Sequence, residues 1–296
     1  MPRVELPEAV VDNLGAFGEA GPRWAEDFHW ILERVLQQWG LTLEALYEDL
    51  SYHFVARVRR GAEPLVLKLG VPLEELRSEI AALRQFAGRG MAVLLDADAE
   101  LGALLLERID PGRPLSELDD DDRAMAIAAE RMQALWCPPP DEATFWTVSR
   151  WGRAVRKLLE SGTPTPLAEH LEHADRMLQA ATPDGQVKLM HGDYHQYNVL
   201  QRGDGSWVVI DPKGAVGDPG YEVWPLMLNC LDCDDPVARL QARARRLARE
   251  TPLDEEHILR WTHAGATLSA AWDVEDAGPG RAPDLTRVEW AATARR

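Results

Sequence analysis

The segment 189–222 constrains the fold and the chemistry of this chain more than any other stretch of its sequence. It reads LMHGDYHQYNVLQRGDGSWVVIDPKGAVGDPGYE, so Asp193 is followed by Asn198 five residues later and by Asp211 after the apolar run 207–210. A carboxylate and an amide supply the hard oxygen ligands that Mg²⁺ shares with phosphate groups. A further carboxylate can accept the proton of an attacking hydroxyl. The pattern therefore predicts a phosphoryl-transfer site.

The order and spacing of these residues narrow the prediction. Protein kinases carry the catalytic loop H-R-D-x-x-x-x-N and a separate metal-binding Asp downstream. Here His191-Gly192-Asp193 precedes Asn198 by the same spacing. The alternative is a zinc site, because His191, Asp193 and His195 would share one face if this stretch were a strand. Gly192 and Asn198 favour a loop, so the kinase-like interpretation is the stronger one, and in it His191 orders the loop backbone.

A second pair of candidate residues lies in the first third of the chain. The runs 53–59 and 65–69 are separated by a short turn, which predicts a β-hairpin with Lys68 near the end of its second strand. A helix with one apolar face is predicted at 74–86, and it carries Glu79 eleven residues after Lys68. In kinases, a strand lysine paired with a helix glutamate holds the α- and β-phosphates of the nucleotide.

The remaining pattern divides the chain into two parts. A helix at 24–39 and strands at 91–95 and 103–106 complete a small antiparallel lobe with the hairpin. The rigid, turn-rich Pro111-Gly112-Arg113-Pro114 that follows is suited to a hinge. Beyond it, helical patterns dominate, at 119–136, 142–161, 166–181, 221–231, 236–249 and 254–276.

We therefore expect an α+β fold of the bilobal protein-kinase-like type. It would have an N-terminal nucleotide-binding lobe at 1–106, a hinge at 107–114 and a larger, mainly helical lobe at 115–296 that holds the catalytic loop and the acceptor site. The formal net charge of −17 argues against nucleic acid as a partner, because Lys and Arg drive phosphate binding. The same charge suits a cationic small-molecule substrate, although surplus carboxylates also keep a protein soluble.

Composition also bears on the compartment. No apolar run approaches the ~20 residues that span a bilayer, and the start Met1-Pro2-Arg3-Val4-Glu5 is unlike a signal peptide, so we expect a cytoplasmic protein with no membrane association. Three cysteines are too few for a disulfide framework. Cys230 and Cys233 form a C-x-x-C pair without a thioredoxin-like context or a second ligand pair, so we expect two small apolar residues late in a helix. Monomer and homodimer both stay open.

Taken together, these segments resemble the aminoglycoside phosphotransferase family, nearest to its branch of streptomycin 6-phosphotransferases and hydroxyurea kinases. The most specific likenesses are the H-G-D-x-x-x-x-N loop at 191–198 and I-D-P-K-G-A-V-G-D-P at 210–219. Supporting likenesses lie at 67–69, 79–84, 104–109 and 268–276. The resemblance implies a two-lobed kinase-like fold and O-phosphorylation of a small hydroxylated molecule with ATP and Mg²⁺.

The resemblance also implies roles for the residues of the second lobe. Asp193 would be the catalytic base, and Asn198 and Asp211 the Mg²⁺ ligands. Lys213 follows two residues after Asp211, and its charge would offset negative charge on the transferring phosphoryl group. An ordinary salt bridge to a nearby carboxylate is the alternative for Lys213. We expect Asp218, in the following turn, to support the catalytic loop.

For the nucleotide, the resemblance implies that Lys68 contacts the phosphates and is anchored by Glu79, while the backbone near Glu107 and Ile109 holds the adenine. The sequence departs from the family in one place. The nucleotide-covering turn is often glycine-rich in the family, whereas the residues before the predicted hairpin contain no glycine. Ser51 is the candidate to replace a backbone donor there with its hydroxyl. This departure leaves the choice between ATP and GTP open.

The predicted function is thus an ATP- and Mg²⁺-dependent O-phosphotransferase acting on a cationic, aminoglycoside-like molecule such as streptomycin. A metabolic sugar or amino-sugar kinase is the alternative, because acceptor specificity depends on side chains whose arrangement a sequence does not give. A nucleotide-binding pseudokinase without turnover is the alternative of another class. Carboxylates that could hold a cationic acceptor are Glu222, Asp232, Asp234, Asp235, Asp273, Glu275 and Asp276.

Overall fold

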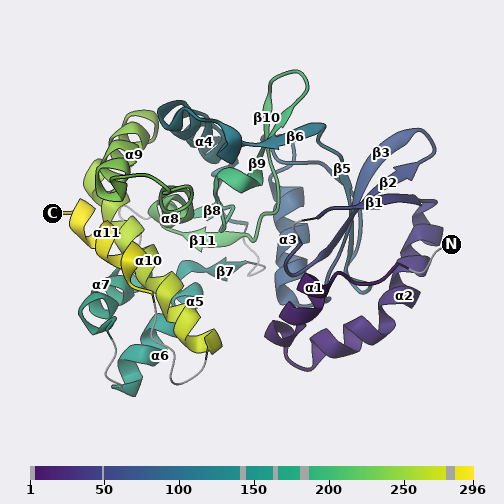
Figure 1. The fold of residues 1–296 in the computed structure, drawn as a ribbon, viewed down its shortest axis with the longest axis horizontal. Helices are drawn as coiled ribbons and strands as arrows, with labels where there is room; N and C mark the ends of the chain where they lie inside the picture. The colour runs from purple at the N-terminus through teal and green to yellow at the C-terminus, as the bar shows by residue number, and fades with distance from the viewer. Residues whose placement is uncertain (1–3, 49, 141–144, 163–165, 181–186, 278–283) are drawn as a thin grey trace. The chain divides into compact units, whose positions relative to one another are not determined.

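The computed structural model describes residues 4–48, 50–140, 145–162, 166–180, 187–277 and 284–296. The chain forms two compact units, Met1–Asp110 and Pro111–Arg296 (Figure 1). The division falls inside the segment 107–114, which the sequence predicts as a hinge. No helix in the described ranges is long and apolar enough to cross a membrane.

The first unit is built on a five-stranded antiparallel sheet in the order β1-β2-β3-β5-β4. Its strands are β1 (Thr42–Leu46), β2 (Phe54–Arg60), β3 (Glu63–Leu69), β4 (Leu94–Asp98) and β5 (Ala103–Glu107). The predicted hairpin and β5 are confirmed, whereas the strand predicted at 91–95 lies three residues further on. β1 is not predicted because it is a largely exposed edge strand without an apolar alternation.

Alternation along β3 decides what each face of the sheet packs against. Leu65, Leu67 and Leu69 are buried in one core with Phe28 and Val35 of α2 (Ala20–Trp39), behind which lie α1 (Glu8–Asn13) and η1 (Leu14–Phe17). Because successive strand residues point to opposite faces, Lys68 emerges on the other side. That side carries α3 (Glu74–Gln85), the helix that holds Glu79. The predicted helices of this unit are confirmed.

The turn-rich segment Pro111-Gly112-Arg113-Pro114, which the sequence predicts as part of a hinge, is a short strand. It forms β6 (Pro111–Pro114) and pairs with β9 (Val199–Arg202) in the three-stranded sheet β10-β9-β6. Proline lacks a backbone N–H and is tolerated at the edge of a sheet, and β6 is an edge strand with a register shift between Pro111 and Arg113. The second unit therefore begins with a strand that packs directly beside the catalytic segment.

The second unit is mainly helical. Its helices are η2 (Leu115–Glu117), α4 (Asp121–Leu135), α5 (Val148–Trp151), α6 (Arg153–Ser161), α7 (Ala168–Gln179), α8 (Val223–Leu228), α9 (Pro236–Glu250), α10 (Glu255–Ala277) and α11 (Thr286–Ala294). Helix α10 is the centre of this unit, because it contacts α6, α7, α8, α9 and α11 (Figure 1). The helix predicted at 142–161 is wrong at Trp146–Thr147, which form a strand, and it is divided at Gly152 into α5 and α6; its first residues, 142–144, lie outside the described residues.

The segment 189–222 folds as two short sheets joined by loops. β8 (Lys188–Met190) leads into the loop and into η4 (Gln196–Asn198), after which β9 and β10 (Trp207–Val209) form a hairpin. β11 (Ala215–Gly217) then pairs with both β8 and β7 (Trp146–Thr147), and η5 (Pro219–Glu222) follows. Because β11 pairs with β8 and β9 with β10, the loops at 191–195 and 210–214 lie side by side.

Candidate active site

His191 is fully buried and ties the two loops together. Its Nε2 lies 2.7 Å from the carbonyl oxygen of Ile210, so this nitrogen carries the proton and donates it. Its Nδ1 is then the acceptor for the backbone N–H of Asp193, at 3.2 Å. The carbonyl oxygen of His191 accepts from the N–H groups of Lys213 and Gly214 at 2.8 and 2.9 Å. Burial lowers the pKa of His191 to about 4, so the ring stays neutral and keeps this tautomer.

Glu222 holds the same loop by accepting two hydrogen bonds from its backbone. Its two carboxylate oxygens accept from the backbone N–H groups of His191 and Gly192 at 2.9 and 3.0 Å, and the residue is only 1% exposed. Burial raises the pKa of Glu222 to about 8, although the two backbone donors act in the opposite direction. Gly192 has a φ of 89°, and a Cβ there would lie 3.2 Å from that of Ala215. The expectation that Glu222 contacts the substrate is therefore wrong.

Asp193 and Asn198 are brought together at the mouth of this loop. Asn198 donates from Nδ2 to the carbonyl oxygen of Asp193 at 3.0 Å, and this backbone acceptor fixes which way the amide points. The amide oxygen of Asn198 is thereby left as its ligand atom. The carboxylate of Asp193 is 39% exposed, with its Oδ1 3.7 Å from Nε2 of His195. The proposed base is thus accessible, while the proposed metal ligand beside it is held in place.

Asp211 lies next to Asn198 because the backbone N–H of Ile210 donates to the carbonyl oxygen of Asn198 at 2.9 Å. Asp211 has a φ of 57°, a left-handed conformation that is strained for a residue with a side chain. Its Oδ2 lies 3.1 Å from Nζ of Lys213, so the salt bridge that we gave as the alternative for Lys213 is present. Both side chains are about 30% exposed, at 31% and 28%, so this ion pair remains open to a ligand.

Two further side chains attach the loop to distant helices. The hydroxyl of Tyr194 donates to the carbonyl oxygen of Ala128 in α4 at 2.8 Å. Nε2 of Gln196 donates to the carbonyl oxygen of Leu226 in α8 at 3.0 Å. Neither hydrogen bond could be predicted from the sequence, because both acceptors are backbone carbonyl oxygens, which every residue carries. Glu222 had a detectable signal, since a lone carboxylate followed by the apolar run 223–228 indicates burial.

In the first unit, the predicted ion pair between Lys68 and Glu79 is confirmed. Lys68 Nζ lies 2.7 Å from Oε1 of Glu79, and the two side chains are 7% and 4% exposed. The strand β3 and the helix α3 hold them at this distance. A charged pair at this depth is costly to bury and is held by mutual attraction and hydrogen bonding. The contact of Lys68 with nucleotide phosphates stays a prediction.

The other nucleotide candidates also lie in the first unit. Ser51 is exposed between β1 and β2, and its carbonyl oxygen accepts from Asn13 at 3.1 Å. Glu107 ends β5, and its Oε1 accepts from the backbone N–H of Val93 at 2.8 Å. Ile109 is buried just before the end of this unit. Their contacts with a nucleotide stay predictions.

Two alternative readings of the sequence can be set aside. Zinc binding by His191 is contradicted, because both of its ring nitrogens are used in hydrogen bonds to Ile210 and Asp193. Across the described ranges, no group of three or more His, Cys, Asp or Glu residues is arranged to hold a metal ion. The C-x-x-C cysteines are free thiols. They do not lie late in a helix, since α8 ends at Leu228.

Asp218 supports the site through η5 and α10. Its Oδ1 accepts from the backbone N–H of Gly220 at 2.7 Å, which caps the start of η5. The same oxygen accepts from Nε2 of His257 at 2.9 Å. Because η5 also carries Glu222, Asp218 supports the catalytic loop indirectly, by holding the element from which Glu222 binds the loop backbone. The predicted supporting role is consistent with this arrangement.

Comparisons with known proteins place the fold and the family. Residues 42–277 match the model of the aminoglycoside/hydroxyurea antibiotic resistance kinase family. A streptomycin 6-kinase of Streptomyces glaucescens is 31% identical over 92% of each chain. A hydroxyurea phosphotransferase of Kitasatospora aureofaciens is 30% identical over 92% of this chain and 81% of its own.

The fold is shared with a wider set of kinases. A choline kinase from Streptococcus pneumoniae superposes with a TM-score of 0.62 at 17% identity, covering 90% of this chain and 97% of that one. The aminoglycoside phosphotransferase APH(4)-Ia, solved with ADP and hygromycin B, gives 0.61 at 15% identity, covering 89% and 95%. The predicted α+β kinase-like fold is thereby confirmed. The chain belongs to the aminoglycoside/hydroxyurea antibiotic resistance kinase family and is a small-molecule phosphotransferase.

Proposed function

We propose that this protein transfers the γ-phosphoryl group of ATP, with Mg²⁺, to a hydroxyl group of a cationic, streptomycin-like molecule. One observation carries the proposal. The second unit leaves the carboxylate of Asp193 accessible, and it fixes Asn198 and Asp211 beside it through backbone hydrogen bonds. This is an oxygen-rich site with a free base, and it lies on a chain of the matching family.

The donor atoms fit Mg²⁺ better than a softer metal. The amide oxygen of Asn198 and the carboxylate of Asp211 are hard oxygen ligands, and Mg²⁺ is usually held by one or two such groups together with substrate phosphates. When bound, the ion would neutralise negative charge on the phosphates during transfer. The Lys213 ammonium, 3.1 Å from Asp211, brings a positive charge to the same place.

The reaction requires a proton acceptor at the attacking hydroxyl. Asp193 would take that proton as the new oxygen–phosphorus bond forms and the bond between the γ-phosphorus and the ADP oxygen breaks. His191 accepts from the backbone N–H of Asp193, and Glu222 holds the backbone of His191 and Gly192 just before it, so the carboxylate of Asp193 is oriented before the substrate arrives. Lys68, anchored by Glu79, would hold the α- and β-phosphates.

The relatives favour a cationic acceptor. Two of them are streptomycin 6-kinases, at 31% and 28% identity, and a third is a streptomycin 3''-kinase at 30%. The net charge of −17 suits attraction of a cation. Hydroxyurea, the substrate named for the fourth relative, is neutral and is the second candidate acceptor.

A coupled assay of ADP release tests the proposal. The purified protein would be supplied with Mg-ATP and, in turn, with streptomycin, hydroxyurea, amino sugars and simple sugars. We expect ADP release with streptomycin that stops when EDTA removes Mg²⁺. Turnover with sugars alone would instead identify a metabolic kinase. Measurable ATP binding without ADP release from any acceptor would identify a pseudokinase.

A further inference from the structure

Three consecutive residues of the catalytic loop point in three different directions. Gln196, Tyr197 and Asn198 form η4, and successive side chains of a 3-10 helix are rotated by about 120°. Gln196 reaches inward to the carbonyl oxygen of Leu226, and Asn198 reaches the carbonyl oxygen of Asp193. Tyr197 faces solvent with 53% of its surface exposed. It therefore projects from the turn that connects the proposed base to the proposed metal ligand.

The exposed ring of Tyr197 lies beside His195. The two rings pack edge-on, with centroids 5.9 Å apart at an interplanar angle of 69°. His195 in turn lies 3.7 Å from the carboxylate of Asp193. Interaction with the side chain of Cys230 raises the pKa of the Tyr197 hydroxyl, so the segment after α8 lies next to Tyr197. An exposed aromatic ring is thus one side chain away from the proposed base.

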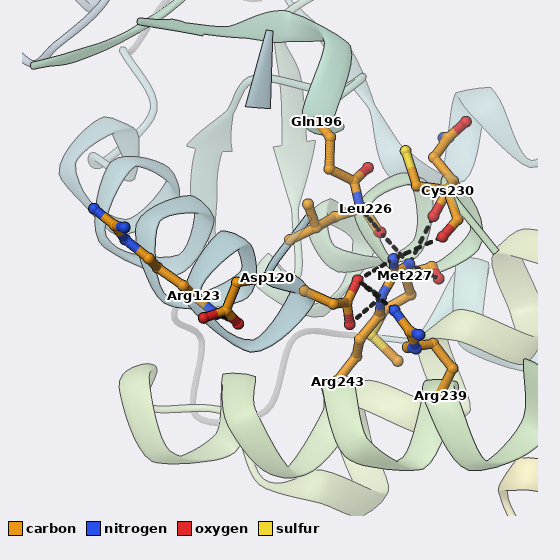
Figure 2. Close-up of polar contacts among 10 residues, drawn as sticks. Asp120, Arg123, Gln196, Leu226, Met227, Cys230, Arg239 and Arg243 are labelled. Atoms are coloured by element: carbon orange, nitrogen blue, oxygen red, sulfur yellow. Dashed lines mark hydrogen bonds and ion pairs between the residues drawn. The ribbon is translucent and has the colours of Figure 1, made fainter. Parts of the chain in front are cut away.

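A buried arginine fixes the backbone of Cys230. Arg243 is 1% exposed and donates from Nη2 to the carbonyl oxygen of Cys230 at 3.0 Å. Its Nη1 donates to the carbonyl oxygens of Met227 and Asn229 at 2.8 and 2.6 Å, which closes the end of α8 (Figure 2). Nη2 also lies 2.6 Å from Asp121 at the start of α4. One guanidinium therefore connects the segment after α8 to two other helices.

The backbone of Cys230 is strained. Its φ is 54°, a left-handed value that glycine or asparagine adopts with less strain. Within the described ranges, the only other non-glycine residue with positive φ is Asp211, which belongs to the site. Such a conformation persists where the surrounding structure imposes it, and here Arg243 holds the carbonyl group of Cys230. The segment beside Tyr197 is therefore held in a fixed conformation.

From this arrangement we infer that Tyr197 receives a cationic group of the acceptor on its ring face and sets the preference for cationic over neutral acceptors. The inference rests on the proposed function and names the residue that gives it substrate selectivity. A guanidinium or ammonium group is attracted to the face of a tyrosine ring. Asp232 and Asp234, exposed in the same segment as Cys230, add negative charge that favours a cation.

Acceptor kinetics with two variants test this inference. Tyr197→Ala should raise the KM for streptomycin, which carries guanidinium groups, by about tenfold. The KM for ATP should stay unchanged, and so should the KM for hydroxyurea, if that neutral acceptor is used. Tyr197→Phe keeps the ring and should retain most of the affinity. Trp30→Ala, which removes another exposed aromatic residue from α2, is the matched control and should change none of these constants.

Equilibrium binding keeps the test independent of turnover. Calorimetry of streptomycin binding to the wild type and to Tyr197→Ala should show the same tenfold weakening, even if no acceptor is phosphorylated and the proposed function fails. Equal streptomycin affinity in the two proteins would overturn the inference. So would an absence of streptomycin binding to the wild type, because the acceptor would then not be a cation of this kind.

Discussion

The candidate residues of the first unit and those of the second are held in place in opposite ways. In the first unit, Lys68 and Glu79 are themselves the buried contact, 2.7 Å apart and almost without exposure. In the second unit, Asp193 is 39% exposed, and its support comes from other residues, chiefly His191 and Glu222. A substitution at Lys68 or Glu79 is therefore expected to change stability as well as the proposed nucleotide binding. In the second unit, Asp193 and the residues that hold its loop can be substituted separately.

The largest expected effect is a loss of turnover without a loss of stability. Asp193→Asn should lower kcat by roughly 10²–10⁴-fold, because the amide cannot take the hydroxyl proton. Its unfolding free energy should hardly change, since the carboxylate is partly exposed and carries no buried network. ADP release measures the first quantity, and urea unfolding measures the second. Turnover at the wild-type rate would remove Asp193 from the mechanism.

The buried pair should show the opposite behaviour. Lys68→Met removes the ammonium group that pairs with the buried carboxylate of Glu79 and should destabilise the protein by about 3–5 kcal/mol in urea unfolding. The double variant Lys68→Met/Glu79→Leu should recover most of this loss, because no charge is left buried. Calorimetry should nonetheless show that ATP affinity is not recovered.

An exposed pair in the same unit provides the control. Arg60 and Glu63 lie 2.9 Å apart with 41% and 48% exposure, so Glu63→Gln should cost less than about 1 kcal/mol. A double variant at Lys68 and Glu79 that binds ATP normally would show that the pair is structural only. In that case Lys68 and Glu79 would contribute to stability and not to nucleotide binding.

Glu222 offers a pH-dependent test of the scaffold. Its pKa is raised from 4.5 to about 8 in the folded protein, so between these values the folded state holds a proton that the unfolded chain has released. Stability from this group is therefore present at low pH and lost as pH rises toward 8. Glu222→Gln lacks this proton. Its stability deficit relative to the wild type, about 1–3 kcal/mol at pH 5, should shrink by pH 9.

Urea unfolding of both proteins across this pH range measures the difference. His191, whose pKa is lowered to about 4, is unchanged in the variant, so its contribution to the pH dependence cancels. A deficit that stays constant from pH 5 to pH 9 would mean that Glu222 is ionised in the folded protein throughout this range. In that case the two backbone donors from His191 and Gly192 would outweigh the effect of burial.

This comparison also explains what the sequence could predict. The spacing of Lys68, Glu79, Asp193, Asn198 and Asp211 was sufficient for the fold and for the candidate site, because chemistry demands those residue types in that order. Supporting contacts could not be predicted in the same way. Glu222 binds backbone N–H groups, and a partner of that kind has no residue type to recognise. The pairing of the edge strand β6 was not predicted either, because the prolines and the glycine of 111–114 are typical of turns.

The smallest expected effect concerns the strain at Asp211. Its φ of 57° costs a residue with a side chain about 1–2 kcal/mol, whereas glycine adopts this conformation freely. Asp211→Gly should therefore be more stable than Asp211→Ala by that amount, although both lose the ion pair with Lys213 and both should lose Mg²⁺-dependent ATP binding. Asp204 has no positive φ, so there glycine should give no advantage over alanine. Equal stability of the two Asp211 variants would mean that the left-handed conformation is not imposed by the surrounding loops. Greater stability of Asp211→Gly together with lost nucleotide binding would show that the second unit keeps a strained backbone in order to place a ligand, whereas the first unit places Lys68 without such strain.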